Sequence, residues 1–432
     1  MSEEPAVRLD VADKRMLQTW ARISVTNLFV LSLLGAALRY KAAFSLPAVN
    51  YKYLLNAHSH FAFTGWATTV IYTVLVYMLG QSGVRLSRGY RHLFRLNQIS
   101  AYAMLICFSW QGYGTASIVA SALSVLVSYG FVILYWLDMA RTSWPRAVRY
   151  GVQLALVFLV LSSAGPFLLV YSMSHAAGMA FYYNSIYLFL HFQYNGWFSF
   201  SAIAAFFWMT RMYGWELPRR ATARLVVLMG VACVPAYCLS LLWTDPPFWI
   251  WAVAGCAALV QLAALRILLV VVWRGNGSGA APDLPASVRI LWTISLVALV
   301  MKLVLQGLSA IPAVGRLAFG YRPVIIAYLH LVLLGFISIF FLGLLLAARL
   351  VNVSSAMGRA GLLAFVSGVI VNEIFLTIQS LAGYAGHGWE TSVYWLFGVA
   401  LWMAIGIAGM IIQRPQKQDP RQDCRGPKTP NQ

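Results

Sequence analysis

The sequence is poor in charge, and acidic residues are especially scarce. Only 10% of its 432 residues are Asp, Glu, Lys or Arg, and just 12 are acidic against 31 that are basic, whereas soluble domains carry about 25% charged residues. This scarcity, together with a hydrophobic content of 61%, excludes a water-soluble globule. The five cysteines form no CxxC pair, so neither a disulfide framework nor a thiolate metal site is indicated. We therefore predict an all-α integral membrane protein.

Long apolar runs fill most of the chain. A membrane-spanning helix needs about 20 mostly apolar residues. On that rule we expect about twelve transmembrane helices in a single domain over residues 1–413, and a disordered basic cytoplasmic tail over residues 414–432. The twelve expected segments are 19–39, 53–79, 94–115, 117–138, 150–172, 184–209, 222–243, 247–272, 288–310, 323–348, 357–382 and 393–413.

Basic residues are distributed unevenly between the two sets of loops. Arginines follow the second, fourth and sixth segments, whereas the connections after the third, fifth, seventh and eleventh segments hold no Lys or Arg. The positive-inside rule then places both termini in the cytoplasm, and we expect a multi-pass protein of the bacterial inner membrane. The loops account for the net charge of +19, so we expect the lipid bilayer and not nucleic acid as the partner. The basic residues left on the outer side are Arg39, Lys41, Lys52, Arg316 and Arg322.

Four of the seven histidines lie inside apolar segments, namely His58, His60, His191 and His330. At a rise of about 1.5 Å per residue, all four fall at one level in the outer third of the membrane. Intramembrane ionisable groups are rare, so each is a functional candidate. His60, His191 and His330 each begin a His-x4-Gly line, at spacings of 131 and 139 residues. These spacings predict three related four-helix units with a histidine on the second helix of each.

One interpretation is that these histidines have a structural role and hydrogen-bond to neighbouring helices. Their shared depth and repeated motif favour haem or metal ligation instead, because neutral imidazole is a common ligand that low dielectric tolerates. Zinc alone is disfavoured, since no carboxylate or thiolate is adjacent. His92, His175 and His387 lie in or near expected loops, and we predict that they are solvated.

The helix plan and two short lines resemble subunit I of the haem-copper oxidases and nitric oxide reductases. NAHSHFAF is similar to that family's helix-two line, and AYLHLVLLG is similar to its helix-ten line. The resemblance implies a low-spin haem b between His58 and His330, and a copper ligand at His191. The family's high-spin haem ligand falls on Tyr328, and CLSLLWTDPP lacks the paired copper-binding histidines. Copper would therefore have an incomplete ligand set, and a complete oxygen-reducing centre is not evident.

A second resemblance is to the NnrS family of twelve-helix haem- and copper-containing proteins tied to nitric oxide stress. Its His-x-His-x4-Gly line matches His58, His60 and Gly65, although Phe61 stands where that family has an acidic residue. The oxidase-like alignment selects His58 as the helix-two ligand, whereas the internal repeat selects His60. The two lie about 200° apart around a helix, so one metal would not take both.

Further polar residues lie within the apolar segments. Lys302 and Glu373 are each about nine residues from the outer end of their segments, so we expect them to pair directly or through one water. Gln306 lies one turn from Lys302 on the same face. The alternatives are a proton path or contacts with haem propionates. Arg322, eight residues before His330, is our expected propionate partner.

These patterns together favour a haem-binding membrane protein with a role in electron transfer or in nitric oxide or respiratory metabolism. Its partners would be a redox protein or a small gas ligand such as nitric oxide. One alternative is a transporter or channel for ions or protons without haem, although Pro166, Pro235 and Pro312 do not break helices near the histidines. A haem-free assembly partner of an oxidase is another. Enzymatic turnover is left open.

Overall fold

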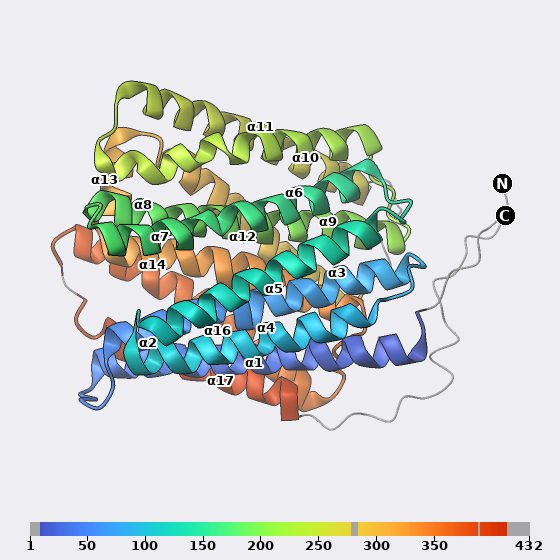
Figure 1. Ribbon diagram of the computed structural model, residues 1–432, viewed down its shortest axis with the longest axis horizontal. Helices are drawn as coiled ribbons and strands as arrows, with labels where there is room; N and C mark the ends of the chain where they lie inside the picture. The colour runs from blue at the N-terminus through green and yellow to red at the C-terminus, as the bar shows by residue number, and fades with distance from the viewer. Residues whose placement is uncertain (1–8, 278–283, 388, 413–432) are drawn as a thin grey trace.

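A computed structural model of the chain describes residues 9–277, 284–387 and 389–412, so the expected tail at 414–432 lies outside the described residues. The regular structure in these ranges is helical, with no strand, and Figure 1 shows the long helices running side by side along the long axis of the molecule. The α-helices are α1 (Val11–Ala43), α2 (Tyr51–Phe61), α3 (Thr69–Gln81), α4 (Arg88–Gln111), α5 (Thr115–Met139), α6 (Arg146–Ser162), α7 (Ala164–His175), α8 (Met179–Leu190), α9 (Ser199–Met212), α10 (Arg219–Cys233), α11 (Phe248–Gly277), α12 (Ala286–Leu308), α13 (Pro312–Gly320), α14 (Arg322–His330), α15 (Ile339–Ala347), α16 (Ala356–Tyr384) and α17 (Ser392–Ile412). Three π-helical segments, η1 (Ala62–Thr68), η2 (His191–Phe198) and η4 (Leu331–Ser338), and one 3₁₀ segment, η3 (Pro235–Thr244), complete them.

Within the described ranges, ten helical runs are long and apolar enough to cross a membrane. This confirms the expected all-helical, multi-pass class. The helix α4 and the continuous run α8–η2–α9 are also long, but they are not among the ten. Twelve spans therefore remain a prediction.

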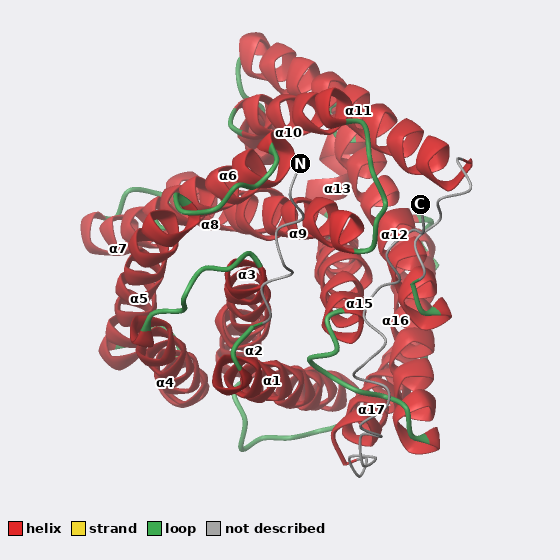
Figure 2. Cartoon of the chain, turned by 90° about the vertical axis from the view of Figure 1, so that its right-hand side faces the viewer, coloured by secondary structure: helices red, strands yellow, loops and turns green. Residues whose placement is uncertain are grey.

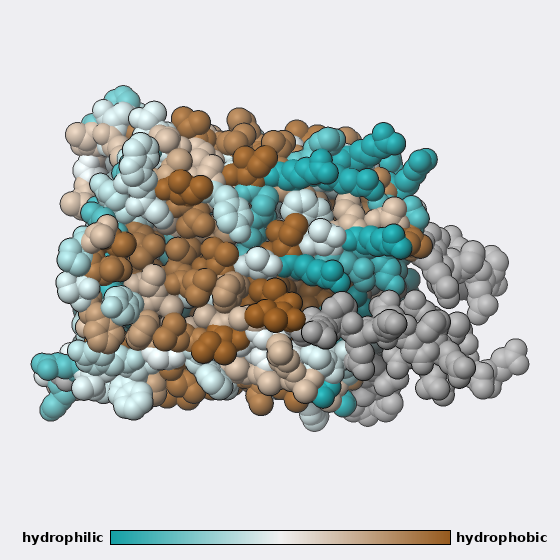
Figure 3. All heavy atoms as spheres, turned by 90° about the horizontal axis from the view of Figure 1, so that it is seen from below, coloured by the Kyte–Doolittle hydropathy of each residue, from teal (hydrophilic) through white to brown (hydrophobic). Residues whose placement is uncertain are grey.

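The outside of the bundle is apolar, as contact with lipid tails requires. Phe248, Trp110 and Trp273 expose 83%, 77% and 76% of their surface. Figure 3 shows apolar atoms across the middle of one face and strongly hydrophilic side chains gathered at the right-hand end. That is the end at which α1 begins in Figure 1.

Three helical runs form the centre of the bundle. The span Tyr51–Gln81 is 83% buried over its most apolar window and Arg322–Ala347 is 72% buried, against 28–50% for the other eight spans. The third central run contains η2, all eight residues of which are buried. In the view down the helix axes in Figure 2, α3, α9 and α15 lie toward the middle, and α3 contacts both of the others. The three central runs are therefore the ones that carry His58 and His60, His191, and His330.

Each central run widens into a π-helical segment beside its histidine. The segment η2 begins at His191, η4 begins one residue after His330, and η1 begins two residues after His60. Such π segments are rare and are frequent at functional sites. A hydroxyl at or directly after the end of each segment donates to the carbonyl five residues earlier, in the pairs Thr69 to Thr64 (3.2 Å), Ser199 to Tyr194 (2.5 Å) and Ser338 to Leu333 (2.7 Å).

Neighbouring helices bind carbonyl groups of the π segments. Asn27 of α1 donates its Nδ2–H to the carbonyl of Gly65 at 2.6 Å. Ser295 of α12 donates its hydroxyl to the carbonyl of Phe336 at 2.9 Å. Because buried carbonyls need partners, these side chains stabilise the widened turns and fix the rotation of the central helices.

Candidate functional site

His58 lies on α2 and faces α1. A Cβ atom built on Gly35 of α1 would lie 3.4 Å from the Cε1 atom of His58, so the glycine lets the two helices approach at the ring. The buried Nδ1 atom of His58 forms no hydrogen bond of good geometry among the described residues, although the backbone of Leu31 interacts with this ring. The ring is close enough to His330 and to Arg39 for electrostatic interaction with both. The two histidines that the oxidase-like alignment selects are therefore within electrostatic range of each other.

His330 is the last residue of α14, and its hydrogen bond defines its tautomer. Its Nδ1 atom lies 2.8 Å from the carbonyl oxygen of Ile326, so Nδ1 carries the proton and donates it. The Nε2 atom then carries a lone pair, and it has no hydrogen-bond partner within the described ranges. A ring held through Nδ1–H by a carbonyl is the arrangement in which metal-binding histidines present Nε2 to a metal.

The outer halves of the central runs are loosely packed, whereas the inner halves are close-packed. All residues of α15 except Leu346 are buried, but α14, directly before η4, has no buried residue, and α8 has only Ser185. Side chains on a central helix that are not covered by neighbours leave surface for another group to cover. His58 and His330 both stand in this loosely packed part and are themselves only partly buried.

Two charged side chains join the histidine pair. Arg39, near the end of α1, interacts electrostatically with His58, with His330 and with Glu373 of α16. Glu373 accepts a hydrogen bond at Oε1 from Nδ2 of Asn372, at 3.1 Å. We call His58, His330, Arg39 and Glu373 the outer cluster; its members come from four helices, α1, α2, α14 and α16.

Lys302 and Glu373 form no direct ion pair among the described residues, so the direct form of the expected pairing is absent. The Nζ atom of Lys302 donates instead to Oδ1 of Asn195, and Glu373 has the partners given above. The physical reason is that equal depth fixes only one coordinate of a side chain. Helix α12 packs against α11, η4 and α15, whereas α16 packs mainly against α17 and α14 and only slightly against η4, so mostly different helices surround the two residues.

His191 belongs to a second polar group, in which every hydrogen bond has a defined direction. Lys302 donates to Oδ1 of Asn195, and Nδ2 of Asn195 donates to Nδ1 of His191 at 3.1 Å. Nε2 of His191 donates in turn to the carbonyl oxygen of Cys233 at 2.8 Å. Both ring nitrogens of this fully buried histidine are therefore occupied, and neither offers a free lone pair to a metal. We call these four residues the inner chain.

His60 faces away from the outer cluster, toward α4. Its ring stacks on Phe108 with centroids 4.1 Å apart, and its Nε2 atom lies 3.2 Å from the hydroxyl of Tyr113. Tyr113 stands in the short connection between α4 and α5. The direction of the hydrogen bond between His60 and Tyr113 depends on the tautomer of His60. Of the two candidates on the second expected segment, only His58 is brought to His330.

The remaining predicted polar residues are distributed around these groups. Gln306 donates from Nε2 to Oε1 of Gln261 at 3.1 Å, and it accepts a 3.4 Å hydrogen bond from the hydroxyl of Tyr328. Arg322 is exposed at the start of α14. Sequence reasoning preferred Arg322 as the basic partner of His330, but the structure brings Arg39 to the histidines instead. Arg39 was one of the basic residues that the positive-inside rule left on the outer side, and this exception could have identified it as the partner of the histidines.

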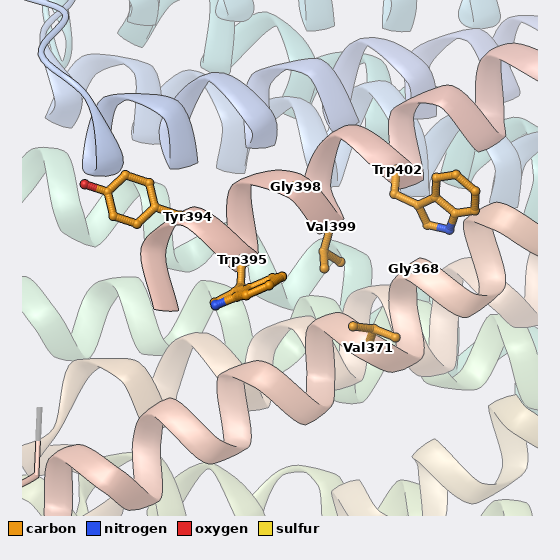
Figure 4. Close-up of a pocket in the computed structure, with 7 residues that line it drawn as sticks. All are labelled: Gly368, Val371, Tyr394, Trp395, Gly398, Val399 and Trp402. Atoms are coloured by element: carbon orange, nitrogen blue, oxygen red, sulfur yellow. The ribbon is translucent and has the colours of Figure 1, made fainter. Parts of the chain in front are cut away.

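A shallow apolar groove runs along the outside of α16 and α17. It has a volume of about 490 Å³ and is lined by Gly368, Val371, Tyr394, Trp395, Gly398, Val399 and Trp402. Figure 4 shows the aromatic side chains of α17 along this groove. Tyr394, Trp395 and Trp402 are each at least half exposed, so this is a lipid-facing surface and not an enclosed site.

Two further observations limit the possible chemistry. His92, His175 and His387 are exposed, which confirms the prediction that they are solvated.

Across the part of the chain that the structure describes, no three His, Cys, Asp or Glu side chains come close enough to hold a metal ion together. A two-histidine site is the metal-binding arrangement that the outer cluster could provide.

The sequence matches no protein-family model, and no curated protein matches it.

Proposed function

We propose that the protein is a haem-binding integral membrane protein of the haem-copper oxidase-like type, with a low-spin haem b between α2 and α14. His58 and His330 would be its two axial ligands. The observation that carries this proposal is that two imidazoles from central helices, 272 positions apart in the chain, lie within electrostatic range of each other, with Nε2 of His330 unengaged. Such a haem supplies reversible one-electron chemistry at its iron.

The residues of the outer cluster fit this group. The buried Nδ1 atom of His58 forms no hydrogen bond of good geometry among the described residues, although the backbone of Leu31 interacts with the ring, and an unsatisfied buried polar atom costs about 1–3 kcal/mol. Gly35 keeps the space beside that ring free of a side chain, and α14 has no buried residue although it lies within the second most buried of the ten spans. A flat apolar group with one polar edge would cover this surface.

Arg39 is the residue we propose to bind the propionates of such a haem, in place of Arg322. It lies near the outer end of α1, within electrostatic range of both proposed ligands. A guanidinium binds carboxylates through two parallel hydrogen bonds, which orients as well as neutralises them. Arg39 would therefore hold the polar edge of the group toward the outer surface.

We also propose that the chain spans the membrane twelve times, in three related four-helix units, with both termini in the cytoplasm. The three π segments beside the three His-x4-Gly lines support this. So do the glycines of those lines: a Cβ on Gly196 would overlap Phe158 of α6, and a Cβ on Gly335 would lie 3.3 Å from Ala298 of α12. In both cases the second helix of a proposed unit packs through its glycine against the first.

The biological role that fits best is electron transfer, or nitric oxide or respiratory metabolism, in a bacterial inner membrane. The partner would be a redox protein or a small gas ligand such as nitric oxide. The inner chain argues for a haem protein without a complete copper site, because Asn195 and the Cys233 carbonyl occupy both nitrogens of His191. The position of the family's high-spin haem ligand holds Tyr328 instead of a histidine, and the hydroxyl of Tyr328 donates to Gln306.

Optical spectroscopy of the protein purified from haem-replete membranes tests the proposal. The wild type should show the Soret and α bands of a low-spin haem b. His58→Ala and His330→Ala should each abolish that spectrum, because a methyl group cannot replace an axial ligand. His60→Ala is the matched control and should keep the spectrum. A colourless wild type would contradict the proposal and favour a haem-free transporter or channel, and unchanged spectra in all three variants would contradict the ligand assignment.

A further inference from the structure

Arg266 carries a guanidinium within an apolar membrane helix, on the side that faces away from the bundle. Helix α11 begins at Phe248 and its apolar run ends at Trp273. At a rise of about 1.5 Å per residue, Arg266 lies about 27 Å from the first of these residues and about 10 Å from the second. Its side chain is exposed, so in a bilayer it would stand among lipid tails. A charge at this depth is costly, which makes Arg266 a candidate for a functional contact.

The elements around Arg266 supply no carboxylate. Helix α11 packs mainly against α10, η3 and α12, and none of these four elements contains Asp or Glu. Their other charged residues are all basic, namely Arg219, Arg220, Arg224, Arg274, Arg289 and Lys302. Neither of the two salt bridges in the described ranges involves Arg266. A guanidinium does not lose its proton in proteins, so this charge has to be compensated from outside the chain.

Arg266 belongs to a strip of exposed residues on α11, which we call the α11 strip. Its members recur at alternating intervals of three and four positions, so they share one side of the helix, as in the seam between two packed helices. The strip runs from Trp249 to Trp273 and includes Ala252, Cys256, Ala263 and Arg266. Figures 1 and 2 both place α11 at the edge of the bundle. Because three of these side chains are small, another helix can approach the strip closely.

We propose that the α11 strip is the docking surface for a transmembrane helix of another protein, and that a carboxylate of that helix pairs with Arg266. A guanidinium binds a carboxylate through two parallel hydrogen bonds, and such a pair offsets the cost of holding either charge in lipid. This inference goes beyond the proposed function and does not depend on haem.

A second copy of this chain does not fit the strip. Two copies inserted in one membrane have the same orientation, so a symmetric contact through α11 would place one Arg266 beside the other. Glu373, the carboxyl group inside α16, is eleven residues from the outer end of its helix, or about 16 Å, against about 27 Å for Arg266. Another copy therefore brings no carboxylate of α16 to the level of Arg266.

Cross-linking to a synthetic peptide in vesicles of zwitterionic lipid tests this proposal. The probe is a polyleucine transmembrane helix with one Glu at the level of Arg266 and one Cys at the level of Cys256, which is exposed on the α11 strip. Mild oxidation should join the peptide to Cys256. The yield at low peptide density should be about tenfold higher than with a matched peptide that has Leu in place of Glu, as expected of one polar contact between membrane helices.

Variants of the chain locate the contact. Arg266→Leu should lower the yield of the Glu peptide to that of the Leu peptide, whereas Arg274→Leu, at an exposed basic residue nearer the inner end of α11, is the control and should keep the preference. If Arg266→Leu does not fold, a peptide with its Glu moved by two helical turns gives the same comparison on the wild type and should lose the preference.

Equal yields for the Glu and Leu peptides on the wild type would overturn the inference, because Arg266 would then simply extend toward the lipid headgroups. A preference for the Glu peptide that survives Arg266→Leu, or that survives the displacement of the Glu, would overturn it as well. So would an equal yield of cross-linked protein in Cys256→Ser, since the peptide would then bind at another surface.

Discussion

The indole Nε1 of Trp66 donates a hydrogen bond of 2.8 Å to the hydroxyl oxygen of Ser338, and this bond joins η1 to η4 across 272 positions of the chain. Both side chains are almost completely buried. The same hydroxyl of Ser338 donates to the carbonyl of Leu333 at 2.7 Å. One buried oxygen thus fixes two central helices to each other and also stabilises the widened turn of one of them.

We expect Trp66→Phe to lower the free energy of unfolding by about 1 kcal/mol through the lost hydrogen bond, with a further cost for the smaller ring. Ser338→Ala should cost more, because it leaves the indole N–H and the Leu333 carbonyl without this partner. The measurement is reversible unfolding in detergent. The double variant should lose less than the sum of the two single variants. Strict additivity would show that the two side chains are not coupled.

The inner chain predicts a strong dependence of stability on Asn195. Asn195→Leu removes the acceptor of a buried ammonium and the donor to Nδ1 of His191, so we expect a loss of about 3 kcal/mol. Lys302→Met should cost less, since it removes the charge and keeps an apolar side chain of similar length. The double variant, with no buried ammonium left to satisfy, should recover part of the loss caused by Asn195→Leu.

Folded yield and thermal unfolding are measured for Asn195→Leu, Lys302→Met and the double variant, which together form a double-mutant cycle. Arg211→Met, an exposed basic residue at the end of α9, is a control for the loss of one positive charge. A double variant with a loss equal to the sum of the two single variants would contradict direct coupling between Lys302 and Asn195.

The close contact of α16 with α17 predicts opposite outcomes for two glycines. A Cβ on Gly361 would lie 2.5 Å from the carbonyl oxygen of Gly406 and 2.9 Å from the amide nitrogen of Met410, whereas a Cβ on Gly398 meets nothing within 4 Å. Gly361→Ala must therefore push two backbones apart, and we expect a loss of about 1–3 kcal/mol. Gly398→Ala should be neutral or stabilising, by up to about 1 kcal/mol of helix propensity. Equal melting temperatures would contradict this packing.

The occupied nitrogens of His191 predict the limits of catalysis. The purified protein should consume no appreciable oxygen with a chemical reductant, and His191→Phe should leave the low-spin spectrum unchanged. Oxygen electrode measurements and optical spectra check the two expectations. Robust cyanide-sensitive oxygen consumption, or loss of the low-spin spectrum in His191→Phe, would show that His191 or unrecognised ligands complete a second metal centre.

Much of the fold could be predicted from composition and run length alone. Apolar runs of about 20 residues have only one way to satisfy their backbone groups in lipid, so the helical class followed directly. The repeated His-x4-Gly lines also marked the three central runs, because a side chain that lipid would reject has to face protein. The π segments were not predicted, since α and π turns use the same residue types and differ in how neighbouring helices bind the released carbonyls.

The candidate site was only partly visible in the sequence. His58 and His60 were both left open as ligands, and the structure turns the first toward His330 and the second toward Phe108. Arg322 was preferred because it is close to His330 along the chain, although eight residues of helix separate them by about 12 Å along the axis. Arg39, 291 positions away in sequence, is the arginine near the ring.

The sequence by itself determined which residues enter the membrane and how deep they lie, because helix rise is fixed at about 1.5 Å per residue. Only the tertiary structure decided which way each side chain faces and which it meets. Lys302 and Glu373 were correctly identified as buried or partly buried polar groups at similar expected depth, yet they have different partners. Rotation about a helix axis and the choice of neighbouring helix depend on packing between segments hundreds of residues apart, and each π turn rotates the side chains that follow it relative to a regular α-helix.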